Sequence, residues 1–111
     1  MSKAKQKGTS AETAVVNWLK DKGRKYVERR SLNGINDRGD VSGIPDLVIE
    51  VKNHARMELS AWVAELEVEM NNDKARHGVV IHKKKGTTDV GKWYATMPVS
   101  VWYELLRDAG Y

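Results

Sequence analysis

The sequence predicts one domain of the α/β (α+β) class, in which helices flank a central mixed sheet. A chain of 111 residues is long enough for a single hydrophobic core and too short for two domains. Helical and strand-like hydrophobic periodicities alternate along it in the order α-β-β-β-α-β-β-α. No internal repeat or low-complexity tract interrupts this order. The elements are therefore expected to pack as helices against one small sheet.

The N-terminal region is predicted to be a basic arm followed by a helix. Residues 1–8 are rich in lysine and poor in large apolar side chains, which is typical of a disordered arm. A helix is expected from Thr9, because Thr9-Ser10-Ala11-Glu12 fits a capping box with Thr9 as N-cap. Gly23 is expected to end it. Residues 9–111 would then form the folded domain.

The middle of the chain predicts three strands. Residues 25–32 favour a strand, and residues 33–39 form a turn-rich loop. A short strand through Asp40-Val41 turns at residues 42–45 into the clearest strand, from Asp46 to Lys52. The two strands are expected to form a hairpin.

The C-terminal half predicts two helices and two strands. Apolar residues at helical spacing indicate a helix over residues 58–71, followed by a buried strand at 79–81. Residues 92–97 favour another strand. Pro98 is expected at the first position of a last helix that ends near Arg107.

The composition favours a polyanionic partner and excludes thiol chemistry. A net charge of +4 favours a polyanionic partner without requiring one. The chain has no cysteine, so disulfides, thiolate zinc sites and thiol nucleophiles are excluded. It shows no signal-peptide pattern and no apolar run long enough for a membrane span. We therefore expect a cytoplasmic protein without a membrane partner.

The strand that ends at Lys52 carries the clearest chemical signal. Because side chains alternate between the faces of a strand, Leu47, Ile49 and Val51 share one face, while Glu50 and Lys52 share the other, about 6.6 Å apart. Hydrolysis of a phosphodiester needs a divalent cation held by carboxylates, and positive charge near phosphorus. Glu50 is therefore a candidate metal ligand, and Lys52 a candidate for orienting water or neutralising charge. The alternative is a solvated ion pair on an edge strand.

A second carboxylate is expected to join Glu50, because one carboxylate rarely holds magnesium alone. Asp46 lies about 13 Å from Glu50 along the same strand, too far for an easily shared metal. Asp40 lies across the predicted hairpin turn, where side chains on neighbouring strands come within about 5 Å. We favour Asp40 and keep Asp46 as the alternative.

Asp40 followed by Glu50-Val51-Lys52, with Glu12 on the preceding helix, resembles the PD-(D/E)XK nuclease superfamily. Within it, the chain looks most like the small Holliday junction resolvases of archaea and phages. The resemblance implies a restriction-endonuclease-like core and a Mg²⁺-dependent endonuclease in which Mn²⁺ can substitute. It implies Asp40, Glu50 and Glu12 as metal ligands, with Lys52 as a further catalytic residue. Glu12 could equally be only the last residue of the capping box.

The same resemblance implies branched or duplex DNA as substrate and a homodimer as the active form. A single small site cuts one strand, so a cut in both strands needs two copies. No small-molecule cofactor is expected, and a phage-encoded protein would act in the host cytoplasm. The alternatives are a nicking, replication-repair or restriction-type nuclease, or a DNA-binding module without catalysis.

Basic side chains near the predicted site are candidate contacts to DNA phosphates. Lys83, Lys84 and Lys85 form a turn between two strands, and three arginines flank the proposed site. These arginines are Arg29, Arg30 and Arg38. The alternative is that the lysine run is simply solvated.

Other polar residues are expected to have structural positions. Glu65, Glu67 and Glu69 are predicted to face solvent on the second helix, with one of them a candidate for a hydrogen bond to a metal ligand. The histidines lack metal-ligand spacing, and we expect them at the surface or at strand ends; they are His54, His77 and His82. The last helix carries an apolar stripe that could pack inward or form a dimer face, made of Val99, Trp102, Leu105 and Leu106.

Overall fold

The predicted order of helices and strands is confirmed, and a short 3-10 helix is added before the last strand. The structure, a computed structural model, describes residues 2–30 and 37–111. Its elements in chain order are α1 (Lys3–Asp21), β1 (Glu28–Arg29), β2 (Val41–Ser42), β3 (Leu47–Lys52), α2 (Leu59–Asp73), β4 (His77–His82), η2 (Val90–Lys92), β5 (Tyr94–Thr96) and α3 (Val99–Asp108).

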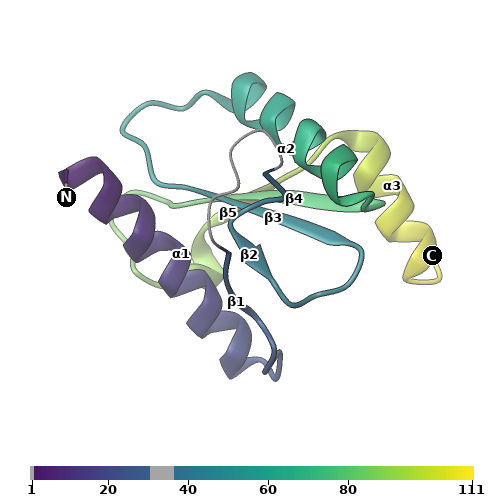
Figure 1. Ribbon diagram of the computed structural model, residues 1–111, viewed down its shortest axis with the longest axis horizontal. Coiled ribbons are helices and arrows are strands. Elements are labelled where there is room, and N and C mark those ends of the chain that lie inside the picture. Colours follow the sequence, from purple (N-terminus) through teal and green to yellow (C-terminus); the bar gives the residue numbers. More distant parts are fainter. Residues whose placement is uncertain (1, 31–36) are drawn as a thin grey trace.

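The five strands form one mixed sheet in the order β1-β2-β3-β4-β5 (Figure 1). β2 pairs with β1 and β3 in antiparallel fashion, and β4 pairs with β5 in the same way. β3 and β4 are parallel, because α2 carries the chain from the end of one to the start of the other. The domain is therefore a three-helix, five-stranded α+β structure with β3 at the centre of the sheet.

The alternation of side chains along β3 separates two hydrophobic clusters. Ile49 and Val51 pack with Val15 of α1 in one cluster. Val48 packs with Trp62 of α2 in the other. α1 and α2 thus cover opposite faces of the sheet. Glu50 and Lys52, which share a face with Val48, are directed toward α2 as their spacing predicts.

The predicted helix start at Thr9 is wrong, because α1 begins at Lys3. Ser2 is the N-cap, and its Oγ accepts a hydrogen bond from the backbone N–H of Lys5 at 3.2 Å. Residues 3–8, expected to form a disordered arm, make the first turns of the helix instead. Lysine, alanine and glutamine are good helix formers, and the serine supplies the cap that the segment needed. Glu12 consequently lies inside the helix and does not belong to a capping box.

Several other boundaries differ from the prediction by a few residues. β1 occupies only two residues of the expected strand 25–32, and residues 31–36 lie outside the described part of the chain. β5 begins two residues after the expected start, because Asp89 caps η2 through the N–H of Gly91. Pro98 is the N-cap of α3 and not its first residue.

α3 lies alongside β4, at the end of the molecule opposite the start of α1 (Figure 1). Most of the predicted apolar stripe is exposed, since Val99, Trp102 and Leu105 are exposed and Leu106 is half-buried. The buried residue of the helix is Val101, which the stripe did not include. Within residues 2–30 and 37–111, no helix combines the length and the hydropathy that crossing a membrane requires.

Candidate metal centre

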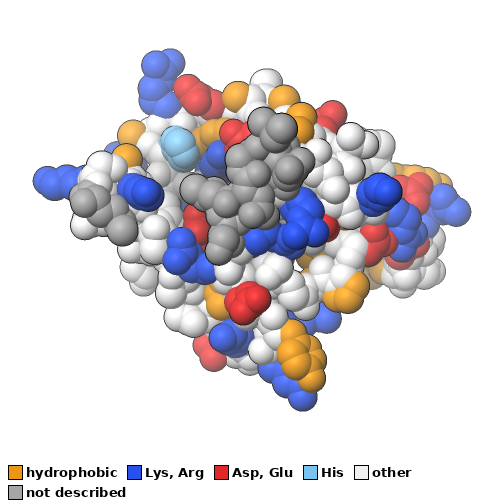
Figure 2. All heavy atoms as spheres, viewed as in Figure 1, with side chains coloured by type: hydrophobic (Ala, Val, Ile, Leu, Met, Phe, Trp, Pro, Cys, Tyr) orange, Lys and Arg blue, Asp and Glu red, His pale blue; other side chains and the backbone are white. Residues whose placement is uncertain are grey.

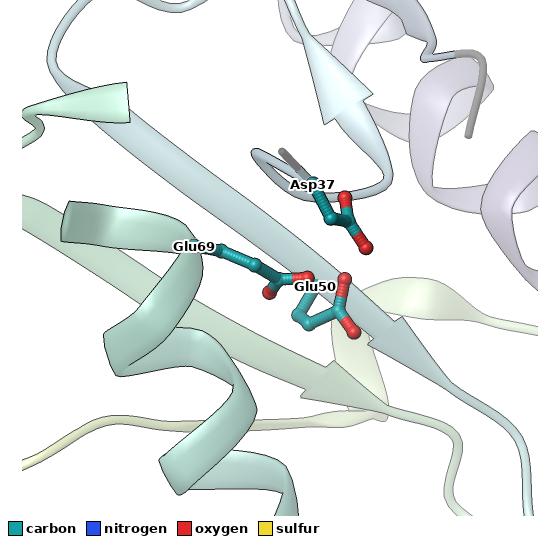
Figure 3. A group of neighbouring side chains, drawn as sticks. All are labelled: Asp37, Glu50 and Glu69. Atoms are coloured by element: carbon teal, nitrogen blue, oxygen red, sulfur yellow. The ribbon is translucent and has the colours of Figure 1, made fainter. Parts of the chain in front are cut away.

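Three carboxylates from separate parts of the chain meet beside β3. Asp37 precedes β2, Glu50 lies on β3 and Glu69 on α2, and their carboxylates point toward one another in Figure 3. One oxygen from each lies within 4.8 Å of the other two. Glu50 is 3% exposed and Glu69 is 2% exposed. This group could hold a metal ion.

The buried carboxylates lack the hydrogen-bond donors that buried acids usually have. Among the described residues, no donor reaches Oε1 of Glu50 or either carboxylate oxygen of Glu69. An unpartnered buried oxygen is costly in free energy, and a cation or a shared proton relieves that cost. The cluster is thus rich in acceptors and poor in donors.

Local structure fixes each of the three side chains. Glu50 faces α2 because of the strand alternation, and Glu69 follows Trp62 by seven residues, which is two helical turns. Asp37 is held by its own turn, in which the N–H of Gly39 donates to Oδ1 of Asp37 at 2.9 Å. Asn72 of α2 donates to the backbone carbonyl of Asp37, also at 2.9 Å. The loop before β2 is therefore tied to α2.

Gly39 is required for this turn. Its φ is +102°, a conformation that side chains disfavour, and a Cβ there would lie 2.9 Å from Cγ1 of Val48. The absence of a side chain lets the loop approach β3 closely. Asp37 and Asp40 can then reach the same strand from either side of the glycine.

Asp40 continues the ladder between β2 and β3 with its side chain. Its Oδ2 accepts a hydrogen bond from the backbone N–H of Val51 at 2.7 Å, and its own N–H donates to the carbonyl of Ile49 at 2.8 Å. Asp40 and Glu50 are close enough for protonated Glu50 to donate a hydrogen bond to Asp40. The predicted proximity of these two carboxylates is therefore present.

Lys52 is the cation nearest to Glu50. Its Nζ lies 3.3 Å from Oε2 of Glu50 and 2.6 Å from Oε2 of Glu65 on α2. Glu12 approaches from α1 and pairs with Arg29, whose Nε lies 3.1 Å from Oε1 of Glu12. Within residues 2–30 and 37–111, Lys52 is the cation that pairs with Glu50.

Burial and mutual repulsion raise the pKa values of the central acids. Burial raises the pKa of Glu50 to about 11, and a hydrogen bond to Glu65 and the charges of Asp40 and Glu69 add to the shift. Burial likewise raises the pKa of Glu69 to about 8, although the proximity of Glu50, which could donate a shared proton to it, acts in the opposite direction. Without a cation, the cluster is expected to retain protons near neutral pH.

The pKa values of the groups around the central acids are shifted as well. Burial raises the pKa values of Asp40 and Glu12, and in Glu12 the nearby Asp40 charge adds to the effect. The hydrogen bond from Glu50 lowers the pKa of Glu65, and Lys52 lowers it further. Burial alone would lower the pKa of Lys52, but Glu65 and Glu50 outweigh it and raise the value. Lys52 therefore stays charged.

The spacing of the three oxygens suits a divalent cation. Ligand oxygens on opposite sides of Mg²⁺ are about 4.2 Å apart, and those on opposite sides of Ca²⁺ up to about 5.2 Å. A span of at most 4.8 Å lies between these values. The three oxygens are therefore close enough together to ligate one divalent cation. Binding would displace the shared protons.

A cleft of about 590 Å³ gives access to these groups. The acidic residues in its lining come from α1, the loop before β2, β3 and α2; they are Glu12, Asp37, Asp40, Glu50 and Glu65. Lys52 also lines it. The cleft therefore contains all four residues that the sequence favoured as the catalytic site, Glu12, Asp40, Glu50 and Lys52.

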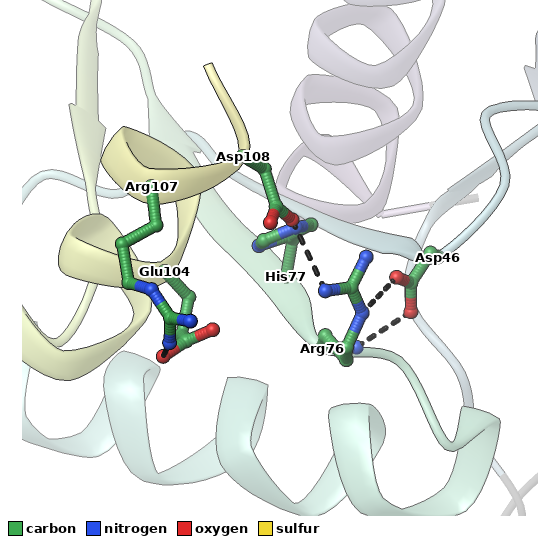
Figure 4. Close-up of polar contacts among 6 residues, drawn as sticks. All are labelled: Asp46, Arg76, His77, Glu104, Arg107 and Asp108. Atoms are coloured by element: carbon green, nitrogen blue, oxygen red, sulfur yellow. Dashed lines mark hydrogen bonds and ion pairs between the residues drawn. The ribbon is translucent and has the colours of Figure 1, made fainter. Parts of the chain in front are cut away.

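Asp46, the alternative second carboxylate, does not lie in this cleft. It precedes β3 with a φ of +63°, and Arg76 donates to it from its backbone N–H at 2.7 Å and from Nε at 2.6 Å (Figure 4). Arg76 also pairs with Asp108 of α3 at 3.1 Å, and His77 contacts the same Asp108 oxygen at 2.7 Å. Asp46 thus joins a polar cluster that links β3, β4 and α3.

Some of the basic residues predicted to contact DNA phosphates pair with acidic side chains, and others line a second cleft. Arg29 pairs with Glu12, and Arg38 lies 3.6 Å from Asp73. Arg30 is half-buried. Lys83, Lys84 and Lys85 line a second cleft beside the first, and Lys84 and Lys85 are exposed. Figure 2 shows lysine and arginine side chains distributed over most of one face, with acidic side chains between them.

Sequence reasoning missed two members of the acidic group. Glu69 was expected to face solvent, yet it is buried, because it continues the inward stripe of Trp62 and Leu66. That helical spacing was the signal that could have identified it. Asp37 had no such signal, since a loop position depends on the Gly39 turn. The expected solvent exposure of Glu67 agrees with the structure.

The histidines occupy less exposed positions than expected. His77 and His82 are the first and last residues of β4, as strand-end positions predict, but both are buried. His54 is exposed after β3.

Comparisons of the chain with protein-family models, with curated proteins and with solved structures found no match. The geometry of the acidic cleft and of the lysine within it therefore carries the functional interpretation.

Proposed function

We propose that the chain is a divalent-metal-dependent endonuclease of the PD-(D/E)XK type that hydrolyses DNA phosphodiesters and has a restriction-endonuclease-like core. The observation that carries the proposal is the position of Glu50 and Lys52 on one face of β3, in a cleft shared with Asp40 and Glu12. The unpartnered oxygens of buried Glu69 beside them supply an independent reason for a bound cation. A purely structural strand would not need this arrangement.

Two ligand sets are compatible with the positions of the side chains, and Glu50 belongs to both. One set adds Asp40 and Glu12, as the family resemblance implies, and the other adds Asp37 and Glu69. A bound Mg²⁺ would polarise the phosphate and lower the pKa of a water molecule. The cleft therefore offers a binding position whichever pair completes it.

Lys52 has a different part in the proposal. Its ammonium group remains charged and lies at the edge of the acidic cluster, within reach of Glu50 and Glu65. Substrate phosphate would compete with Glu65 for this ammonium group, because Glu65 is exposed while Glu50 is buried. Lys52 would then neutralise the charge that develops on phosphorus during hydrolysis.

We further propose branched DNA, such as a Holliday junction, as the preferred substrate and a homodimer as the active form. A net charge of +4 and the exposed Lys84 and Lys85 favour a polyanionic partner. The outward face of α3 exposes Val99, Trp102 and Tyr103, an apolar surface that a second copy could cover. Two copies would supply the two sites that a symmetric junction cut requires.

The direct test is cleavage of a fluorescent four-way junction, a flap and a linear duplex in magnesium, with and without EDTA. We expect magnesium-dependent cutting, fastest on the junction. Glu50→Gln should abolish cutting and leave junction binding intact. Glu67→Gln is the matched control, because Glu67 is exposed on α2 and lies outside the cleft. Junction binding without cutting by the wild type would support a non-catalytic DNA-binding module and contradict the proposal.

A further inference from the structure

A second cleft opens directly beside the acidic one. Its volume is about 780 Å³, and it runs from the end of β3 to the turn after β4. The two clefts share the segment Lys52-Asn53-His54-Ala55 and Lys7 of α1 in their linings. A chain bound in one cleft can therefore continue into the other.

Apart from the residues they share, the two clefts differ in charge. Five acidic residues line the first cleft, whereas none of the described residues that line the second is acidic. The second carries Lys83, Lys84 and Lys85 along one side. Such a basic groove beside a carboxylate cluster suits a phosphate chain whose one phosphate reaches the cation.

A row of four aromatic rings forms the inner wall of the second cleft. His54, Trp62, His82 and Tyr94 follow one another with centroids 5.5 Å apart at each step, and their ring planes are tilted by 50°, 54° and 46°. Trp62 and His82 are each 4% exposed and form the base of the row. His54 and Tyr94 are exposed at its two ends, Tyr94 at 47%. Exposed aromatic side chains of this kind can stack with a nucleobase.

We infer that this basic, aromatic cleft is a subsite for an unpaired nucleotide of the DNA strand whose phosphate enters the acidic cleft. The lysines would contact the backbone, and Tyr94 and His54 would stack with the base. A base inside a duplex offers no free face to a side chain, so the subsite favours unpaired nucleotides at a branch or a flap. The inference rests on the proposed nuclease function, and it names the feature of the substrate that the enzyme recognises.

The test compares two probes that carry the same phosphates. One is a fluorescent oligothymidylate, and the other is an abasic deoxyribose-phosphate chain of equal length. Binding is measured by fluorescence anisotropy in EDTA, so that cutting plays no part. The wild type should bind the oligothymidylate roughly tenfold more tightly, as expected for base stacking on one ring. Tyr94→Ala should remove this difference, and Tyr94→Phe should retain it.

Tyr26→Ala is the matched control, because Tyr26 is an exposed tyrosine before β1 that lies outside both clefts and outside the proposed dimer face. Equal affinity of the wild type for the two probes would overturn the inference, even if magnesium-dependent cutting is observed. Competition by free thymidine monophosphate as effective as that by the oligothymidylate would also overturn it, since the site would then be one for free nucleotides. Base-dependent binding that needs Tyr94, without any cutting, would retain the subsite and refute the nuclease.

Discussion

Replacing Glu69 by glutamine should stabilise the metal-free protein near neutral pH. Burial raises the pKa of Glu69 from 4.5 to about 8, so the folded protein keeps a proton that the unfolded chain releases. The resulting stabilisation is full below pH 4.5 and is lost as the pH rises through about 8. At about pH 7.5 the loss amounts to about 4 kcal/mol, at about 1.4 kcal/mol for each pH unit. This is an upper limit, because the surrounding carboxylates compete for the same protons.

Glutamine has the same shape as glutamate and cannot ionise. The variant therefore does not lose this folding stability as the pH rises. A quarter of the upper limit, about 1 kcal/mol, already raises the Tm of a domain of this size by about 4 °C. Magnesium should stabilise the wild type more than the variant where the ion is held by the set that contains Glu69. At about 100 times its Kd it would stabilise the wild type by about 2.7 kcal/mol, and the variant, which then lacks one ligand, much less.

The assay is thermal unfolding followed by circular dichroism, in EDTA and in magnesium, at about pH 4.5 and about pH 7.5. Glu69→Gln should raise the Tm in EDTA only at the higher pH. Glu67→Gln, two residues away and exposed, should leave the Tm unchanged at both values. A Glu69→Gln shift of equal size at both pH values would refute the reasoning. Full magnesium stabilisation of the variant would assign the ion to the ligand set that contains Asp40 and Glu12.

Three further predictions test other parts of the account. Lys52→Ala should lower the cleavage rate by about 100- to 1,000-fold while magnesium still raises the Tm; loss of the magnesium effect would instead make Lys52 part of the binding site. Asp40→Asn should abolish cutting and Asp46→Asn should not, because Asp46 pairs with Arg76 outside the cleft; equal loss in both variants would contradict the assignment. Trp102→Ser should convert a dimer to a monomer in analytical ultracentrifugation, since Trp102 is exposed on α3, and an unchanged dimer would place the interface elsewhere.

The central part of the site could be predicted because it depends on strand geometry. A strand imposes a two-residue alternation, so Glu50 and Lys52 had to share a face once the apolar Ile49 and Val51 marked the other. The preference for Asp40 over Asp46 followed from distance alone, and the structure places Asp40 in the cleft. These steps needed no knowledge of how the rest of the chain packs.

The parts that were missed depend on contacts between distant segments. Asp37 reaches Glu50 only because Gly39 lets the loop lie against β3. Glu69 is buried because α2 turns its stripe toward the sheet, and a charge in that stripe contradicts the usual preference for exposed glutamate. The early start of α1 depended on the single hydrogen bond at Ser2. Asp37 and Glu69 were thus decided by contacts between distant segments, and the start of α1 by a local cap.

The most direct test of the central claim is the anomalous scattering of crystals soaked in manganese. The account predicts one strong peak per chain, within ligand distance of Glu50 and of at least one further carboxylate of the acidic cleft, and its loss in Glu50→Gln. Peaks found only outside the cleft, or a peak in the cleft that persists in Glu50→Gln, would contradict the account.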